Sequence, residues 1–301
     1  GAPRAPPPPR PASAAALASP SPAPLEAGLE DVLPSGLNFK ALMTPPDDQL
    51  PTRGEVIGSV PEHCFKRDTT KSMAYAACST AITAALGAFA WAVIPLKLAY
   101  WPAWVAYALV TGTAATGCWV IAHECGHNAF SDNRTLQDAV GYVLHSILLV
   151  PYFSWQRSHA VHHSRTNHVT EGETHVPYSV GSLLGDKNLD AKAAMGEGPF
   201  AIFQLIGHLV FGWPAYLFAG ATGGPVRGLT NHFWPTAPFS EALWPGKWKE
   251  KVLRSDVGVA AVLAGLCVWG AKAGLASVAA LYVGPYLVTN VWLVLYTWLQ
   301  H

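Results

Sequence analysis

The sequence LAYWPAWVAYALVTGTAATGCWVIAHECGH, residues 98–127, joins a long uncharged run to a pair of histidines. No charged side chain occurs in residues 98–122, and a helix of about 20 apolar residues is enough to cross a bilayer. His123 and His127 follow at positions i and i+4, which share one face of a helix. This stretch predicts a membrane-spanning helix with metal ligands at its end.

A second histidine motif, HAVHH at residues 159–163, follows after one short apolar stretch. His159, His162 and His163 lie at i, i+3 and i+4, which again share a helical face. Neutral imidazole is a common ligand for zinc, copper, iron and nickel, and a catalytic zinc uses only three protein ligands. Five converging imidazoles therefore predict a site for two metal ions and a reaction harder than hydrolysis.

The composition points to a membrane protein. Half of the 301 residues are hydrophobic and 13% are charged, whereas a soluble domain has about 25% charged residues. The 19 basic and 19 acidic residues cancel, which argues against nucleic acid as a partner. The five cysteines are scattered and form no CxxC pair, a pattern that fits the reducing side of a membrane.

Three segments differ in composition. Residues 1–24 are almost entirely Pro, Ala and Ser with no acidic residue, which is typical of a disordered tail and also suits an organellar transit segment. Residues 25–71 contain scattered prolines and charges and are predicted to form a soluble N-terminal region. Residues 72–301 are predicted to form one membrane domain.

The membrane domain is predicted to be an all-α bundle of four transmembrane helices in two hairpins. The spans are expected at residues 72–96, 98–122, 257–271 and 273–300. Lysines and arginines precede the first and third spans, whereas the turn inside each hairpin carries a single lysine. By the positive-inside rule, both hairpins enter from the cytoplasmic side, and both histidine motifs lie there.

Two further apolar stretches, residues 139–153 and 199–219, are not counted as spans. If both crossed the membrane, the two histidine motifs would lie on opposite faces and could not form one site. We therefore expect interfacial helices that, with the histidine-bearing segments, form a cytoplasmic helical cap. A transmembrane helix at residues 199–219 is the alternative.

HECGH also matches HExxH, the zinc motif of metalloproteases in which the glutamate is the general base. The last two spans contain no internal Asp or Glu to supply a third ligand, and the HAVHH motif would then have no role. This interpretation is disfavoured. His63, His145, His208 and His232 are interpreted as structural residues, and His168 and His175 as surface residues, with an outer-shell or substrate-facing role as the alternative for these two.

Nearby carboxylates are candidates to accept hydrogen bonds from the ring N–H groups of the ligands, because metal-bound histidines usually donate their second ring nitrogen to such a group. The candidates are Glu124, Asp132, Glu171 and Glu173.

The sequence around the histidine motifs resembles that of a known family. CWVIAHECGHNAFSD (118–132), LHSILLVPYFSWQRSHAVHHSRTNH (144–168), GHLVFGWPAYL (207–217) and YTWLQH (296–301) are similar to the integral-membrane fatty-acid desaturases, and to their plant and algal delta-12 (omega-6, oleate) type. The resemblance extends from about Val60 to His301. HECGH, in place of HDCGH, favours the delta-12 over the omega-3 type.

The resemblance implies a non-haem di-iron centre that uses O2 and two electrons to insert a cis double bond into a lipid-linked oleoyl chain. His123 and His127 match the first histidine box of the family, and His159, His162 and His163 match the second. The resemblance implies cytochrome b5 and its reductase as electron donors in the endoplasmic reticulum, or ferredoxin in a plastid.

The family also has a third box, HxxHH, beyond the last span, and the sequence stops before such a motif. His301 stands where relatives carry a histidine and is included as a candidate ligand. We expect the polypeptide as given to be C-terminally incomplete and inactive or poor in metal.

Several alternatives stay open at this point. Hydroxylases, acetylenases, conjugases and omega-3 desaturases share these motifs. Outside the enzymes, the alternative is a non-catalytic membrane scaffold. A multi-pass protein of the endoplasmic-reticulum membrane is expected, with the plastid envelope as the alternative. The oligomeric state is not predicted.

Overall fold

The structure is a computed structural model that describes residues 50–166, 168–178 and 180–300. The predicted tail at residues 1–24 and the candidate ligand His301 lie outside the described residues. Contacts divide the chain into two compact units, residues 1–65 and residues 66–301. In the first unit, α2 (Arg53–Ser59) begins with a capping box between Thr52 and Glu55, and the short helix η3 (Glu62–Phe65) follows.

The second unit confirms the all-α prediction, because the described residues contain helices and no β-strand. Long apolar helices occur at all four predicted spans. They are α3 (Thr69–Val93), α4 (Trp101–Gly126) with η4 (Leu98–Tyr100) before it, α9 (Trp248–Ala273), and a last helix made of α10 (Leu275–Val278), the π-helical turn η5 (Ala279–Val283) and α11 (Gly284–Gln300). The third span, predicted to be short, continues N-terminally as far as Trp248.

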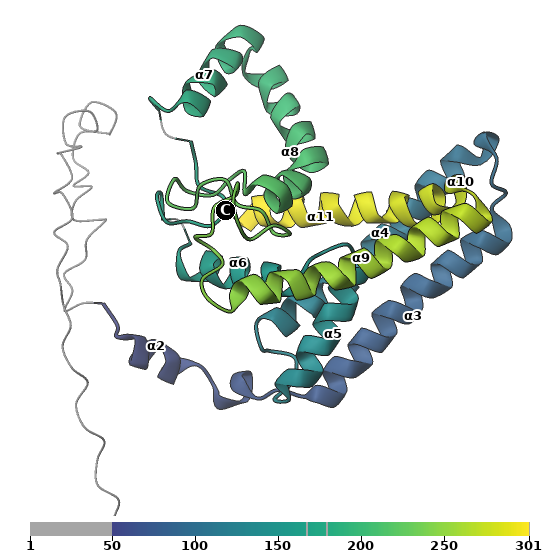
Figure 1. Cartoon of the computed structure of the whole chain (residues 1–301), viewed down its shortest axis with the longest axis horizontal. Helices are drawn as coiled ribbons and strands as arrows, with labels where there is room; N and C mark the ends of the chain where they lie inside the picture. Colours follow the sequence, from purple (N-terminus) through teal and green to yellow (C-terminus); the bar gives the residue numbers. More distant parts are fainter. Residues whose placement is uncertain (1–49, 167, 179, 301) are drawn as a thin grey trace, which may run out of the picture. The chain divides into compact units, whose positions relative to one another are not determined.

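A fifth helix, α8 (Glu197–Ala219), is also long and apolar enough to cross a membrane. It follows α7 (Leu183–Met195) and meets the C-terminal part of α11, where the His208 and Trp298 rings lie 4.8 Å apart. Figure 1 shows α8 running across the direction of α11 and not alongside it. By length and composition the described chain thus has one more candidate span than predicted, while the direction of α8 fits a helix at the interface.

Helix α4 is packed between α3, α5 and α11. A Cβ atom at Gly112 would lie 2.5 Å from the Pro285 carbonyl oxygen, so only glycine permits this approach of α4 to α11. Thr289 Oγ1 donates a hydrogen bond to the Gly112 carbonyl oxygen at 3.0 Å, across the same contact. Close contact through a small residue is typical of helix pairs in membranes.

The π-helical turn η5 precedes Pro285, which has no N–H to donate to the carbonyl oxygen of Leu281. Tyr107 Oη on α4 donates to that oxygen at 3.0 Å instead. A backbone carbonyl without a partner is costly inside a membrane. The irregular turn is therefore stabilised from the neighbouring helix.

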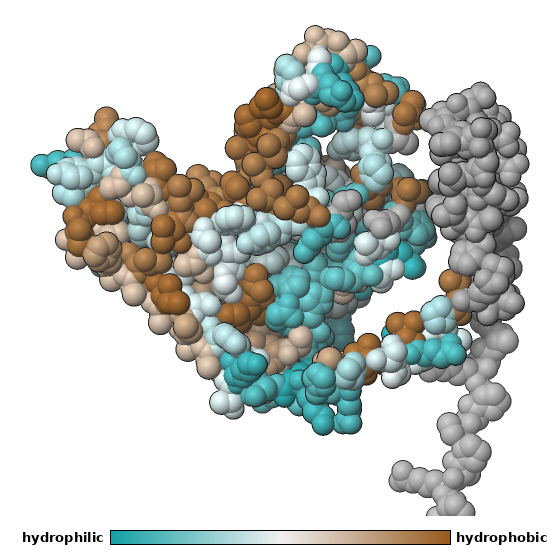
Figure 2. All heavy atoms as spheres, turned by 180° about the vertical axis from the view of Figure 1, so that it is seen from behind, coloured by the Kyte–Doolittle hydropathy of each residue, from teal (hydrophilic) through white to brown (hydrophobic). Residues whose placement is uncertain are grey.

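The remaining helices lie between the first and second hairpins in sequence. Helix α5 (Arg134–Ile147) is amphipathic and, with 14 residues, short for a span, and α6 (Tyr152–Ser164) carries the second histidine motif. In the face shown by Figure 2, hydrophobic side chains dominate the end of the unit that carries α10, and hydrophilic ones gather near the start of α3. This distribution fits an integral-membrane helical bundle with one polar end.

Candidate metal centre

Two helix ends bring the histidine motifs together. His123 lies in the last turn of α4 and His127 is its C-cap residue, whereas His159, His162 and His163 lie on α6. Helix α5 packs against α4, α6 and α9. Because α5 returns the chain along α4, α6 meets the end of α4 that carries HECGH.

Four imidazoles aim their Nε2 atoms at one point. His159 Nε2 lies 2.9 Å from His123 Nε2 and 3.0 Å from His127 Nε2. The Nε2 atoms of His123 and His127 are 3.2 Å apart, and His163 Nε2 is 3.1 Å from His159 Nε2. Nitrogens bound to one metal at about 2.1 Å and at right angles would lie about 3 Å apart. The donor set therefore fits a metal ion.

Helical geometry separates the fifth predicted ligand from these four. His162 is buried, and its ring centroid lies 5.9 Å from that of His159 and 6.1 Å from that of His175. Successive residues are turned by about 100°, so i+4 returns close to the direction of His159, whereas i+3 stops about 60° short of a full turn. His159 and His163 accordingly join the group of four, which does not include His162.

The site favours neutral imidazole. Burial and the neighbouring histidines lower the pKa of His127 to about 4 and that of His159 further below its ordinary value. Metal binding requires neutral imidazole. These two ligands are therefore ready to bind at neutral pH without losing a proton.

The four candidate carboxylates divide into three groups. Glu124 Oε1 lies 2.9 Å from His123 Nδ1, as expected for an acceptor that keeps Nε2 available to a metal. Asp132 instead pairs with Arg67 at 2.7 Å, and Glu171 pairs with Arg165 at 2.7 Å. These two ion pairs are exposed and give neither carboxylate the predicted contact with a histidine. Glu173 is buried against Ser158.

A layer of aromatic rings underlies the four imidazoles. Trp155 stacks on His159 with centroids 4.4 Å apart, and Trp119 lies 5.5 Å from both His123 and Trp155. His145 is fully buried between them, with ring centroids 4.9 Å from Trp155 and 5.5 Å from Trp119. Burial lowers its pKa to about 3, so the ring is neutral.

The sequence predicts a structural role for His145 and does not predict this layer. The signal was present, because Trp119 stands four residues before His123 and Trp155 four residues before His159. Each tryptophan therefore shares the helical face of the first histidine of its motif. The three rings of this layer, Trp119, His145 and Trp155, are buried.

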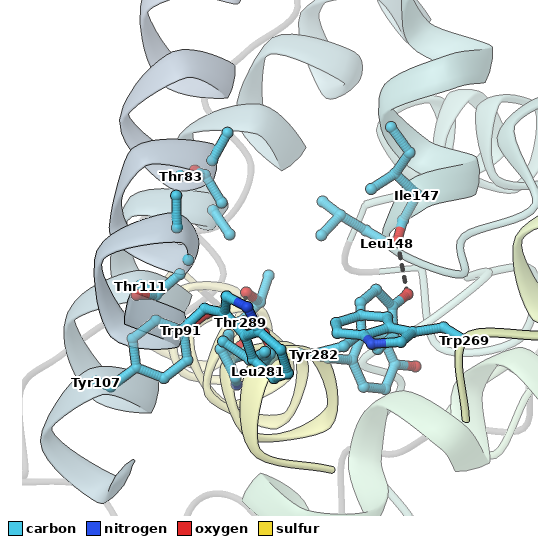
Figure 3. A pocket seen from close by; sticks show the side chains of 16 residues that line it. Thr83, Trp91, Tyr107, Thr111, Ile147, Leu148, Trp269, Leu281, Tyr282 and Thr289 are labelled. Atoms are coloured by element: carbon cyan, nitrogen blue, oxygen red, sulfur yellow. Dashed lines mark hydrogen bonds between the residues drawn. The ribbon is translucent and has the colours of Figure 1, made fainter. Parts of the chain in front are cut away.

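An apolar cavity of about 460 Å³ lies further along α4, between α3, α4, α9, the last helix and the end of α5. Figure 3 shows its walls, with Tyr282 Oη bonded to the Ile147 carbonyl oxygen at 2.6 Å on the side away from α3. The hydroxyls of Thr83 and Thr289 also donate to helix carbonyl oxygens. Because most of its lining is apolar and these three hydroxyls are bonded, the cavity suits a hydrocarbon chain.

The cavity and the histidines are aligned along one helix. Ala115, which lines the cavity, Trp119 and His123 follow one another at intervals of four residues on α4. At 1.5 Å per residue, Ala115 lies about 12 Å from His123 along the axis. Trp119 therefore separates the cavity from the candidate metal site.

Known proteins resemble this chain over most of its length. The model of the fatty acid desaturase family matches residues 99–301. The chain is 39% identical over 252 residues to a delta(12)-fatty-acid desaturase of Arabidopsis thaliana, covering 82% of this chain and 63% of that protein. It is 36% identical over 268 residues to a delta(12) fatty acid desaturase of Mortierella alpina, covering 84% and 66%.

An oleate hydroxylase of Claviceps purpurea is 34% identical over 283 residues, covering 86% of this chain and 58% of that protein. The chain spans less than two thirds of the length of each of these three relatives.

Proposed function

The chain belongs to the fatty acid desaturase family, and we propose that the protein is a delta-12 (omega-6) acyl-lipid desaturase. The substrate is an oleoyl chain of a membrane lipid. A –CH2–CH2– unit, O2, two electrons and two protons give a cis –CH=CH– unit and two molecules of water. The relatives named delta-12 desaturase support this choice of reaction.

The convergence of four Nε2 atoms from HECGH and HAVHH carries the proposal. His123, His127, His159 and His163 would hold one iron, and His162 and His301 are proposed as ligands of a second. Bound iron supplies the activation of O2, which no side-chain acid or base can provide. Glu124 keeps the Nδ1 proton on His123, so that Nε2 faces the metal.

The apolar cavity is proposed to hold the methyl end of the acyl chain. Most of its walls come from long apolar helices, and the hydroxyls of Thr83, Tyr282 and Thr289 are bonded to main-chain oxygens. Its volume lies in the range of about 300–1,000 Å³ that ligand pockets have. A chain anchored there would pass Trp119 on its way to the histidines, and the position of the double bond would depend on how deep the chain extends.

Electron donor and compartment are proposed together. Lysines and arginines precede α3 and α9, which supports a cytoplasmic position for the histidines. We assign the protein to the endoplasmic-reticulum membrane, with cytochrome b5 and its reductase as donors. In the alternative, a plastid envelope, ferredoxin would replace them. Imaging a fluorescent fusion of the whole protein distinguishes the two compartments.

Hydroxylation of the same chain is the second candidate function, and the similarity to an oleate hydroxylase favours it. Both reactions begin by removing hydrogen from the same region of the acyl chain. They differ in whether a second hydrogen leaves or a hydroxyl group is added. The placement of the chain relative to the metal decides between them.

Expression of the full-length gene in yeast, followed by mass spectrometry of the acyl chains, tests both candidates. New linoleate supports delta-12 desaturation. A hydroxylated chain would move the protein to the second candidate. No new lipid, despite membrane-inserted protein that contains iron, would contradict both. The matched control is His159→Ala, which should insert equally well and make no product.

A further inference from the structure

A loop outside both histidine motifs, residues 170–176, contacts α6 through Glu173. The backbone of residues 170–176 pairs with that of residues 222–226 through three hydrogen bonds: Val176 N to Thr222 O at 2.9 Å, Gly224 N to Gly172 O at 2.9 Å, and Val226 N to Thr170 O at 3.3 Å. Residues 170–176, here called the acidic loop, are thereby fixed against the segment that follows α8.

Glycine is needed for this pairing. A Cβ atom at Gly224 would lie 2.3 Å from the Thr170 carbonyl oxygen, and one at Gly223 would lie 2.9 Å from the Glu173 carbonyl oxygen. Backbone oxygens cannot move away as the end of a flexible side chain can. The two glycines therefore let the acidic loop lie close enough to turn Glu173 inward.

Glu173 is only 2% exposed. Its carboxylate accepts a hydrogen bond from Ser158 Oγ, and the Tyr216 hydroxyl lies 2.7 Å from the same Oγ. Tyr216 also hydrogen-bonds Glu173, so that Ser158, Glu173 and Tyr216 form one buried network. Arg227, held by two hydrogen bonds to the Glu171 carbonyl oxygen, supplies positive charge nearby.

Ser158 connects this network to the candidate metal centre. It precedes His159 directly, and on a helix it is turned by about 100° from the face that carries His159 and His163. At the start of α6 the N-cap residue Pro151 provides no side-chain cap, and the Phe153 N–H in the first turn donates to Ser255 Oγ on α9 at 2.9 Å. A buried hydrogen bond at that angle therefore resists rotation of α6 about its own axis.

We propose that Glu173 is a positioning residue for the metal centre, acting through Ser158 to fix the rotation of α6 and with it the direction of His159 and His163 Nε2. The inference rests on the metal site of the proposed function. It differs from the role expected from the sequence, in which Glu173 would accept directly from a histidine ring.

Cobalt(II) titration of the metal-free full-length protein in detergent tests this inference without requiring turnover. The visible absorption of bound cobalt depends on its ligands and geometry. We expect Glu173→Gln to weaken cobalt binding on the order of tenfold and to change the absorption per bound cobalt. Glu171→Gln, in the same loop but in an exposed ion pair, is the matched control and should change neither.

A purely structural role for Glu173 would lower the amount of folded protein and leave the spectrum per bound cobalt unchanged, which would overturn the inference. Ser158→Ala provides a second variant if Glu173→Gln does not fold. It should give the same spectral change as Glu173→Gln. The variant that carries both substitutions should show no larger change in the cobalt spectrum than either single variant. An unchanged spectrum in Ser158→Ala would equally contradict the inference, whereas no cobalt binding by the wild type would contradict the proposed metal site itself.

Discussion

At the scale of single residues, the direction of each imidazole decides its role. His123, His127, His159 and His163 converge because each pair lies four residues apart on its helix. His162 belongs to the same motif, yet one residue of helical rotation leaves it outside the group of four. Motif membership and participation in one metal site are therefore different properties.

His163→Ala and His162→Ala should differ in their effect on the four-histidine site. Removing an outer-shell partner already weakens metal binding about 10–100-fold, so removing the donor His163 should cost more than that. In His162→Ala, the affinity of the four-histidine site for the first cobalt ion should stay within a few-fold of the wild-type affinity. Isothermal titration of the metal-free protein with cobalt measures both. Equal losses in the two variants would contradict the assignment of His162 outside the group of four.

Glu124→Gln should weaken metal binding about 10–100-fold, because an amide is a weaker acceptor for the His123 Nδ1 proton than a carboxylate. The protein should still fold, since Glu124 lies partly exposed at the end of α4. Asp132→Asn, which removes the exposed pair with Arg67, is the control and should bind metal as the wild type does. Metal content per chain after dialysis measures the effect, and the same content in both variants would count against the role of Glu124.

At the scale of helices, the approach of α4 to the last helix determines the bundle. Gly112 permits the contact, and Tyr107 satisfies the carbonyl oxygen that Pro285 leaves without a helical donor. Both features lie within the apolar segments. The two helices therefore pack closely at Gly112, and a side chain of one helix satisfies a backbone carbonyl oxygen of the other. The same contact shapes one wall of the cavity, which Leu281 and Pro285 line.

Gly112→Ala and Gly265→Ala should have opposite effects on stability. Alanine is favoured over glycine in a helix by about 1 kcal/mol, and a Cβ atom at Gly265 meets nothing within 4 Å. The same atom at Gly112 would lie 2.5 Å from both a carbonyl oxygen and Val288 Cβ. Overpacking of this kind costs about 1–3 kcal/mol.

Thermal unfolding in detergent should therefore give a lower midpoint for Gly112→Ala and an unchanged or higher midpoint for Gly265→Ala. A wild-type midpoint for Gly112→Ala would show that α4 and α11 are not held at this separation.

At the scale of the whole molecule, the fold aligns three layers along α4. The four imidazoles lie at its end, the aromatic layer follows, and the apolar cavity comes next. In the proposed reaction, the distance from the imidazoles to the cavity determines how many carbons of the acyl chain fit between the reacting carbons and the methyl end.

Ala88→Leu should narrow the cavity that Ala88 lines and lower the conversion of oleoyl chains relative to palmitoleoyl chains, which are two carbons shorter. We expect a change of about tenfold in that ratio, which corresponds to about 1.4 kcal/mol and thus to the burial of about two CH2 groups. Ala85→Leu is the control, because Ala85 is on the same helix, exposed, and not among the cavity residues. Acyl profiles from yeast give the ratio, and equal ratios in the two variants would argue against a chain in this cavity.

The sequence by itself determined the helical class, the four long apolar helices and the two histidine motifs. These features depend on local patterns: the absence of charge over a bilayer thickness, and the spacing of side chains on a helix. The contact of Glu124 with His123 is also local, between neighbouring residues. Such properties require no knowledge of which helices touch.

Only the tertiary structure decided which side chains meet from distant parts of the chain. It placed His145 between Trp119 and Trp155, paired Asp132 with Arg67, and brought Glu173 to Ser158. It also formed the cavity, whose walls come from five helices. These contacts depend on helix separation and rotation, which close packing of the whole unit sets and no local pattern encodes.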